Sequence, residues 1–166
     1  MKVTVEQVMA WKPCGWDGQD NGKNYTEARV RKLFGRRKYM TALQILGLDI
    51  PYEDRLWGVL REELIWARTL RYFSCDCAER ALERERREGR EPDPRSWEAV
   101  RVSRLYAAGK ATKEELAAAE AAGAAVWTAA ARAAAEAVAE AAGVAREAER
   151  RWQVEHLKKM LKREKP

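Results

Sequence analysis

Two cysteines separated by one residue are the first side chains in this sequence whose type and spacing could do chemistry. Cys75 and Cys77 lie in a stretch of helical periodicity, where residues two apart point to different faces of the helix. Structural zinc sites use a CxxC spacing with a second ligand pair, and only Cys14 and the single histidine, His156, could complete four ligands. We therefore predict structural, buried cysteines and no metal site.

Residues for acid–base or nucleophilic catalysis are also poorly placed. A nucleophilic cysteine needs a basic partner, yet His156 is far away in sequence, and Asp76 and Glu79 would raise the pKa of a nearby thiol. The paired carboxylates are sequence neighbours on expected helix surfaces, except Glu136 and Glu140, which share a face. No glycine-rich phosphate loop, Ser/His/Asp set or HExxH motif occurs. We predict that the protein is not an enzyme and carries no cofactor.

The best candidate for a binding surface is a basic segment near the N-terminus. Residues 23–38 carry a net charge of +6 and residues 146–166 carry +4, whereas the remainder sums to −4. Clustered cations beside aromatic residues can bind phosphates, stack on bases or meet an acidic protein surface, or they can simply be solvated. The predicted partner-binding residues are Trp11, Trp16, Arg29, Arg31, Lys32, Arg36, Arg37, Lys38 and Tyr39.

Two of these residues lie in a loop. Trp11 and Trp16 flank a Pro-Cys-Gly turn within residues 11–24, a stretch rich in glycine, aspartate and asparagine. Two interpretations remain open for these tryptophans. They fold back onto the core, or they form an exposed aromatic surface next to the basic segment.

The elements that position these residues are all predicted to be helices. Isoleucine, valine, threonine and phenylalanine are scarce, which disfavours a sheet. Threonine N-caps precede the short helices, and glycines end the second and third of them. Asp93 is a predicted N-cap, with Pro94 at the first helical position. The expected helices cover residues 4–10, 26–34, 41–46, 51–64, 66–88, 94–109 and 112–163.

The last of these helices is alanine-rich and is expected to form the spine of the fold. Alanine has the highest helix propensity, and Thr112 with Glu115 forms a capping box. Gly123 and Gly143 are the positions where this helix could bend. We expect one all-α domain over residues 1–166, a helical bundle packed on this long helix, with subdivisions at 1–39, 40–109 and 112–163. Large residues are expected to fill the gaps beside the alanines, namely Trp57, Trp66, Trp97 and Trp127.

Composition also suggests a compartment. No long apolar run or signal-peptide core occurs, and three cysteines, an odd number, fit a reducing environment. We therefore expect a cytoplasmic protein without a membrane partner. Self-association through the exposed small side chains of the alanine-rich helix is a further expectation.

Several segments resemble the immunity protein family of high-GC bacteria and their phages, over about residues 40–160. They are residues 43–65 (LQILGLDIPYEDRLWGVLREELI), the segment from Arg71 to Arg80, and the hinge AAGKATKEEL at 107–116 that precedes the alanine-rich helix. The resemblance implies a helical, non-enzymatic protein that neutralises a toxin or a defence component by direct binding. The alternative function is nucleic-acid or nucleotide binding by the basic residues 29–38.

Overall fold

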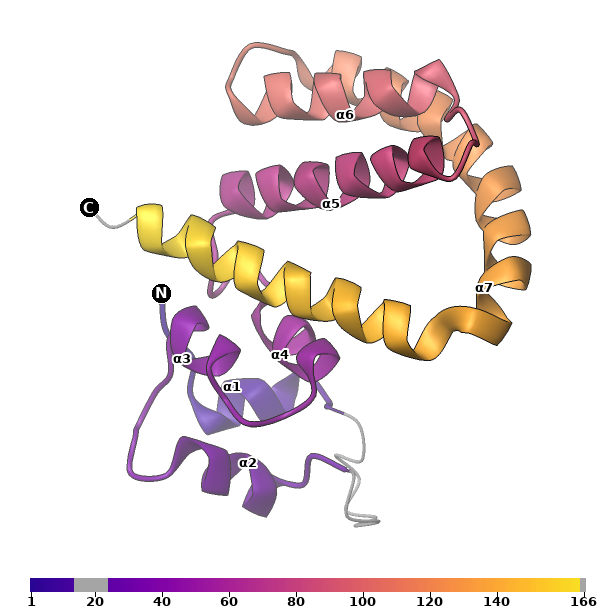
Figure 1. Ribbon diagram of the computed structural model, residues 1–166. Coiled ribbons are helices and arrows are strands. Elements are labelled where there is room, and N and C mark those ends of the chain that lie inside the picture. Colours follow the sequence, from indigo (N-terminus) through magenta and orange to yellow (C-terminus); the bar gives the residue numbers. More distant parts are fainter. Residues whose placement is uncertain (14–23, 165–166) are drawn as a thin grey trace. The chain divides into compact units, whose positions relative to one another are not determined.

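The computed structural model describes residues 1–13 and 24–164, except for the side chains of residues 123–142 and 144. In these parts of the chain every regular element is a helix, and one isolated antiparallel bridge joins Val3 to Met40 (Figure 1). The all-α prediction is therefore confirmed. The helices are α1 (Val5–Ala10), α2 (Glu27–Phe34), α3 (Ala42–Leu46), α4 (Tyr52–Val59), α5 (Ala67–Arg87), α6 (Pro94–Ala107) and α7 (Lys113–Arg163).

The chain forms two compact units. Unit 1 comprises Met1–Trp66 and Arg150–Pro166, and unit 2 comprises Ala67–Glu149. Helix α7 contributes its first part to unit 2 and its last part to unit 1. The prediction of one domain over residues 1–166 stays a prediction.

The short helices of unit 1 begin where the threonine pattern predicts. The hydroxyl oxygens of Thr4, Thr26 and Thr41 each accept a hydrogen bond from a backbone N–H three residues later, at 3.3 Å. These bonds satisfy N–H groups that a helix leaves unpaired at its start. Gly35 ends α2 with a φ of 60°, a conformation that glycine adopts without the steric cost of a Cβ atom.

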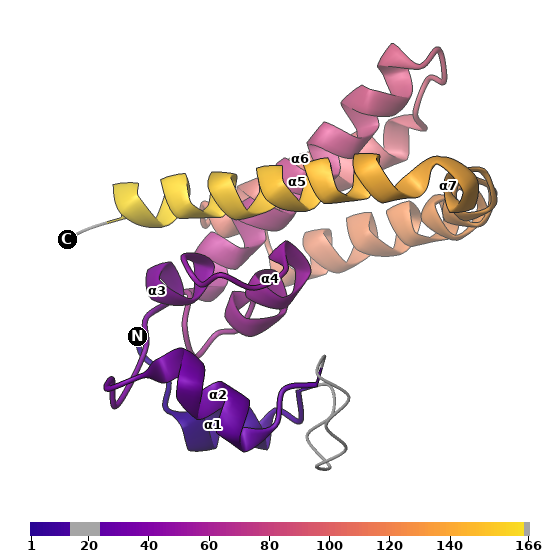
Figure 2. The same cartoon turned by 60° about the horizontal axis from the view of Figure 1, so that its bottom comes forward.

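The core of unit 1 is built from apolar residues of all its segments. Val3 and Met40, 0% and 1% exposed, exchange two backbone hydrogen bonds of 2.9 Å. Helices α3 and α4 approach closely at Gly58, where a Cβ atom would lie 3.3 Å from Cγ2 of Ile45. The last part of α7 passes over α3 and α4 and buries Val154 and Leu157 completely (Figures 1 and 2).

The predicted end of α4 is wrong. This helix was expected to continue to residue 64, but it ends at Val59, and Leu60 leaves the helical conformation with a ψ of 63°. The interruption turns Leu60 outward to 41% exposure and buries both Leu64 and Ile65. An uninterrupted helix would have placed Leu60 inward and Ile65 outward. Because the helix ends at Val59, Ile65 is buried in place of Leu60.

Two of the tryptophans expected to fill the core are exposed. Trp57 is 41% exposed and Trp66 is 67% exposed, so that prediction is wrong for both residues. Smaller aliphatic side chains, such as Leu56 and Ile65, fill the interior beside them instead. Trp97 is half-buried, and the side chain of Trp127 lies outside the described residues.

Unit 2 contains α5 and α6, which lie side by side as an antiparallel hairpin (Figures 1 and 2). The side chains that are buried on α5 include Phe73, Cys75 and Leu82. Both cysteines were predicted to be buried, but Cys77 is only half-buried, because the buried face of α5 is rotated toward Cys75. The Cys75 thiol lies 3.9 Å from the carbonyl oxygen of Val100 on α6.

Charged side chains also join α5 to α6. The guanidinium group of Arg104 binds Asp76 at 2.7 Å and also binds Glu79. Partial burial lowers the pKa of Arg104, but the hydrogen bonds to the two carboxylates outweigh this effect and raise it. Arg104 therefore neutralises the acidic residues next to the two cysteines.

Helix α7 cannot be straight within unit 2. Arg71 and Arg80, nine residues apart on α5, bind Glu120 and Glu149 at 3.3 and 3.0 Å. Nine residues span roughly 14 Å of helix, whereas the 29 residues between the glutamates would span roughly 44 Å if straight. Helix α7 therefore bends between them (Figure 1), in an interval that includes Gly123 and Gly143.

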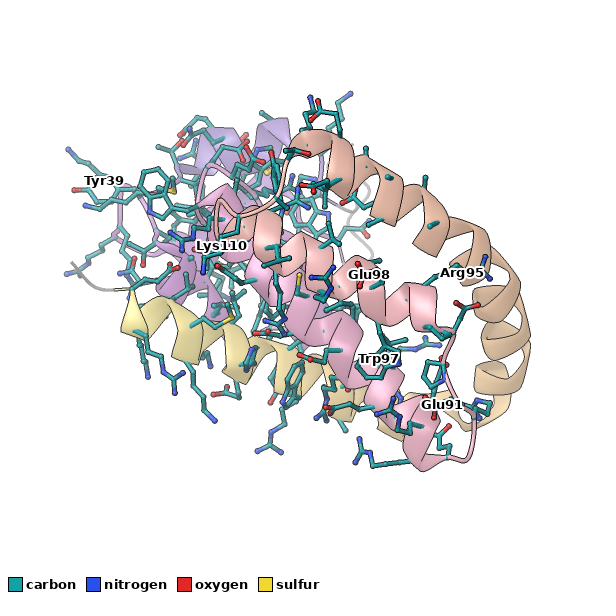
Figure 3. All side chains as sticks on the ribbon, turned by 90° about the horizontal axis from the view of Figure 1, so that it is seen from above. Tyr39, Glu91, Arg95, Trp97, Glu98 and Lys110 are labelled. Atoms are coloured by element: carbon teal, nitrogen blue, oxygen red, sulfur yellow. The ribbon has the colours of Figure 1, made fainter. Side chains whose placement is uncertain are left out.

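The start of α6 is capped as predicted. The Asp93 carboxylate accepts hydrogen bonds from the backbone N–H and the guanidinium group of Arg95, at 2.8 to 3.0 Å, and Pro94 opens the helix. Trp97 lies on the α5 side of α6, with the guanidinium carbon of Arg86 4.8 Å from its ring centroid (Figure 3).

We expect this cap to make the stability of unit 2 depend on pH in the acidic range. The hydrogen bonds from the side chain and then the backbone of Arg95 lower the pKa of Asp93 from 3.8 to about 2. The carboxylate therefore contributes stability above its ordinary pKa, and this contribution is lost as the pH falls through the lowered value. We expect Asp93→Ala to lower the melting temperature at neutral pH, and the difference from wild type to narrow between pH 4 and pH 2.

Circular dichroism melts across this pH range measure the effect. Asp93→Asn is the control, since it keeps a side-chain acceptor for the Arg95 N–H without the titrating charge. A difference between wild type and Asp93→Ala that does not change with pH would contradict the prediction.

Candidate functional site

An apolar cavity of about 420 Å³ lies within unit 1. Its walls come from α1, α2, α3 and α4, from the segments that join them, and from the first unit 1 residue of α7. A cavity of this size is in the range of small-ligand pockets. The lining residues are Val8, Tyr25, Val30, Leu33, Phe34, Met40, Ile45, Leu48, Ile50, Glu53, Asp54, Leu56, Trp57, Gly58, Leu60 and Arg150.

The few polar groups of the cavity are partly bound to one another. The Tyr25 hydroxyl donates a hydrogen bond to Asp54 Oδ2 at 2.6 Å. Arg29 stacks over the Tyr25 ring at 4.4 Å and donates to the carbonyl oxygen of Asn24 at 3.2 Å. Glu53 is exposed, and it forms no ion pair within residues 1–13 and 24–164.

The outer border of the cavity exposes large apolar side chains. Trp57 and Leu60 both line it, and each is 41% exposed. Trp57 is held in place by a second indole, since Trp11 meets it edge-to-face with ring centroids 6.4 Å apart. The Arg61 guanidinium lies 4.3 Å from the Trp11 ring centroid and 4.6 Å from that of Trp57. This arrangement fixes one wall of the cavity.

The predicted basic segment is divided by the structure into two groups. Arg29 is half-buried against Tyr25. Arg31 is paired with two carboxylates, Glu27 at 2.7 Å and Glu6 at 3.3 Å. These two arginines are thus already engaged within the chain.

The second group forms a cationic turn, which we define as Lys32, Arg36, Arg37, Lys38 and Tyr39 together with Lys2. All six side chains are exposed. None of the five cations forms an ion pair with a carboxylate in the described parts of the chain. The bridge between Val3 and Met40 brings Lys2 to this turn, with its Nζ atom 4.3 Å from the Tyr39 ring centroid.

Of the two predicted loop tryptophans, the structure places one. Trp11 is half-buried against Trp57 and Arg61, and Trp16 lies outside the described residues. The sequence reasoning missed Lys2, which joins the turn only through the Val3–Met40 pairing. It also missed Leu60, because its helical spacing indicated a buried position.

The residues considered as metal ligands do not form a metal-binding cluster in the described parts of the chain. No group of three or more His, Cys, Asp or Glu residues there is arranged to hold a metal ion. The imidazole of His156 stacks on Trp152, with ring centroids 4.8 Å apart and an interplanar angle of 11°. Cys14 lies outside the described residues.

No described helix combines the length and hydropathy that crossing a membrane requires. No protein-family model matches this chain, and neither a curated protein nor a solved structure matches it. The resemblance to the immunity protein family stays a prediction.

The stacking of Arg61 between the two indoles should contribute measurably to stability. Because a cation over an aromatic ring is worth about 0.5–2 kcal/mol, we expect Arg61→Ala to lower the free energy of unfolding by about 1–2 kcal/mol. Urea denaturation measures the loss, and tryptophan fluorescence should shift to longer wavelength as the indoles become hydrated. Arg36→Ala, at an exposed position, is the control and should change stability by less than about 0.5 kcal/mol. Equal stability of both variants would contradict the role of Arg61.

Proposed function

We propose that this chain is a non-enzymatic binding protein that neutralises a protein partner by covering it, as an immunity or counter-immunity protein does. Unit 1 provides the contact surface. The observation that carries the proposal is the apolar cavity of about 420 Å³, whose border exposes Trp57 and Leu60.

The size and lining of the cavity favour an apolar anchor as its occupant. Binding energy at protein interfaces is concentrated in a few aromatic or aliphatic side chains that fill pockets of the partner. Trp57 and Leu60 would lose their solvent exposure when such an anchor is bound, which adds buried apolar area at the centre of the contact. Trp11 and Arg61 hold Trp57 in place before binding, so little side-chain order has to be gained.

The polar residues at the border of the cavity indicate which charge the partner would carry next to its apolar anchor. Asp54 is already bonded to the Tyr25 hydroxyl, whereas Glu53 has no ion pair within the described residues. A basic side chain next to the partner's apolar anchor would pair with Glu53 and add specificity. We therefore propose a partner that presents an aromatic or aliphatic side chain flanked by lysine or arginine.

The same groups give support for a binding role without catalysis. The carboxylate of Asp54 accepts a hydrogen bond from the Tyr25 hydroxyl, and the remaining lining of the cavity is mostly aliphatic and aromatic. Such a surface is suited to hydrophobic contact with a partner.

Two matched variants of unit 1 test this surface. Leu60→Lys places a charge at the cavity border, and Trp66→Lys places the same charge at a side chain that is 67% exposed and does not line the cavity. A partner captured from bacterial lysate by the wild-type chain should bind Leu60→Lys at least tenfold more weakly, and Trp66→Lys with unchanged affinity. Calorimetry with the purified partner measures both affinities.

The neutralising role has its own readout. The captured partner, expressed alone, should slow bacterial growth or disable a defence activity, and coexpression with the wild-type chain should restore it. Coexpression with Leu60→Lys should restore it less. A partner whose binding is indifferent to Leu60, or whose activity the wild-type chain leaves unchanged, would refute the proposed function.

A further inference from the structure

We infer that the cationic turn of unit 1 is a binding site for single-stranded nucleic acid, with its cations on the phosphates and the Tyr39 ring against a base. This site uses residues that do not line the apolar cavity. The inference is therefore independent of the proposed function.

The charge of the turn is available to a ligand. Lys32, Arg36, Arg37 and Lys38 lie within seven consecutive residues, and none is paired with a carboxylate in the described parts of the chain. Arg31, in the same segment, provides the contrast, because it is bound to Glu27 and Glu6. Such cations displace the counterions condensed on the phosphates of a nucleic acid, and the release of these counterions favours binding.

The turn is also held in shape before any ligand binds. Phe34 and Met40, 4% and 1% exposed, anchor its two ends in the core. Gly35 reverses the chain with its φ of 60°, and the N–H of Arg37 donates to the carbonyl oxygen of Phe34 at 3.1 Å. Little backbone order has to be gained on binding, which lowers the entropic cost of association.

Tyr39 favours a nucleic acid as the ligand. It is 49% exposed, follows Lys38 in the chain and lies under Lys2, at the place labelled in Figure 3. Single-stranded binding surfaces combine cations with exposed aromatic rings, because every base has a π face that can stack, and no described carboxylate neutralises the cations of this turn.

Fluorescence anisotropy with a labelled single-stranded 12-mer, as thymidine DNA and as uridine RNA, tests the site. Binding should weaken as salt rises, with a log–log slope of about −3 if four phosphates are contacted. The triple variant Arg36→Gln, Arg37→Gln, Lys38→Gln should bind at least tenfold more weakly and have a shallower slope.

The matched control removes the same charge elsewhere. Arg87→Gln, Lys110→Gln and Lys113→Gln change three exposed cations of unit 2, so the net charge of the two triple variants is equal. The control should retain affinity within about twofold. Equal loss in both triple variants would overturn the inference, because binding would then follow net charge and not this turn.

Tyr39 gives a second, charge-free test. Because stacking of a base on an aromatic side chain is worth about 1–3 kcal/mol, Tyr39→Ala should weaken binding about tenfold, and Tyr39→Phe should leave it unchanged. Circular dichroism melts verify that each variant is folded. Poly-glutamate that competes as well as the oligonucleotide, with no effect of Tyr39→Ala, would assign the turn to acidic proteins and overturn the inference.

Discussion

The pairing of Val3 with Met40 is the interaction on which unit 1 depends. The two residues exchange both backbone hydrogen bonds, and both side chains are buried. A buried backbone group that loses its partner costs about 1–3 kcal/mol, so this pair ties the N-terminal segment firmly to the chain that follows α2. Met40 lines the apolar cavity, and the residues next to the bridge, Lys2 and Tyr39, belong to the cationic turn. One short bridge thus positions both candidate binding surfaces.

The distribution of large side chains explains why these surfaces are found in unit 1. Alanine dominates residues 117–148, and the exposed side chains described there offer methyl groups and scattered charges. A methyl group buries little apolar area, so it contributes little free energy to binding a partner. The longer side chains of α7 lie toward its end, where Val154 and Leu157 enter the core of unit 1. Its charged residues Glu120 and Glu149 bind arginines of α5 in unit 2. The alanine-rich helix therefore supports structure at its two ends, where its described side chains reach α5 and the core of unit 1.

The predictions from sequence succeed and fail for identifiable reasons. The N-caps at Thr4 and Asp93 are found because each depends on residues at most three positions away. The end of α4 is missed because the helical spacing of apolar residues favours a buried Leu60, whereas the structure exposes Leu60 and buries Ile65. The candidate binding segment is found as a cluster of charge. The set of cations in this segment that are available to a ligand is smaller than predicted, because Arg31 is bound by Glu6, which lies on another helix.

The sequence by itself determined the helical class, the helix starts and the presence of a basic segment, because these follow from propensity, capping and composition over a few neighbouring residues. Only the tertiary structure decided which cations are available, which tryptophans are exposed, and that a cavity lies among the first four helices. These properties depend on contacts between residues that are distant in sequence, such as Val3 with Met40 and Tyr25 with Asp54. Burial and pairing of this kind are set by the packing of whole elements, which the pattern along one segment does not encode.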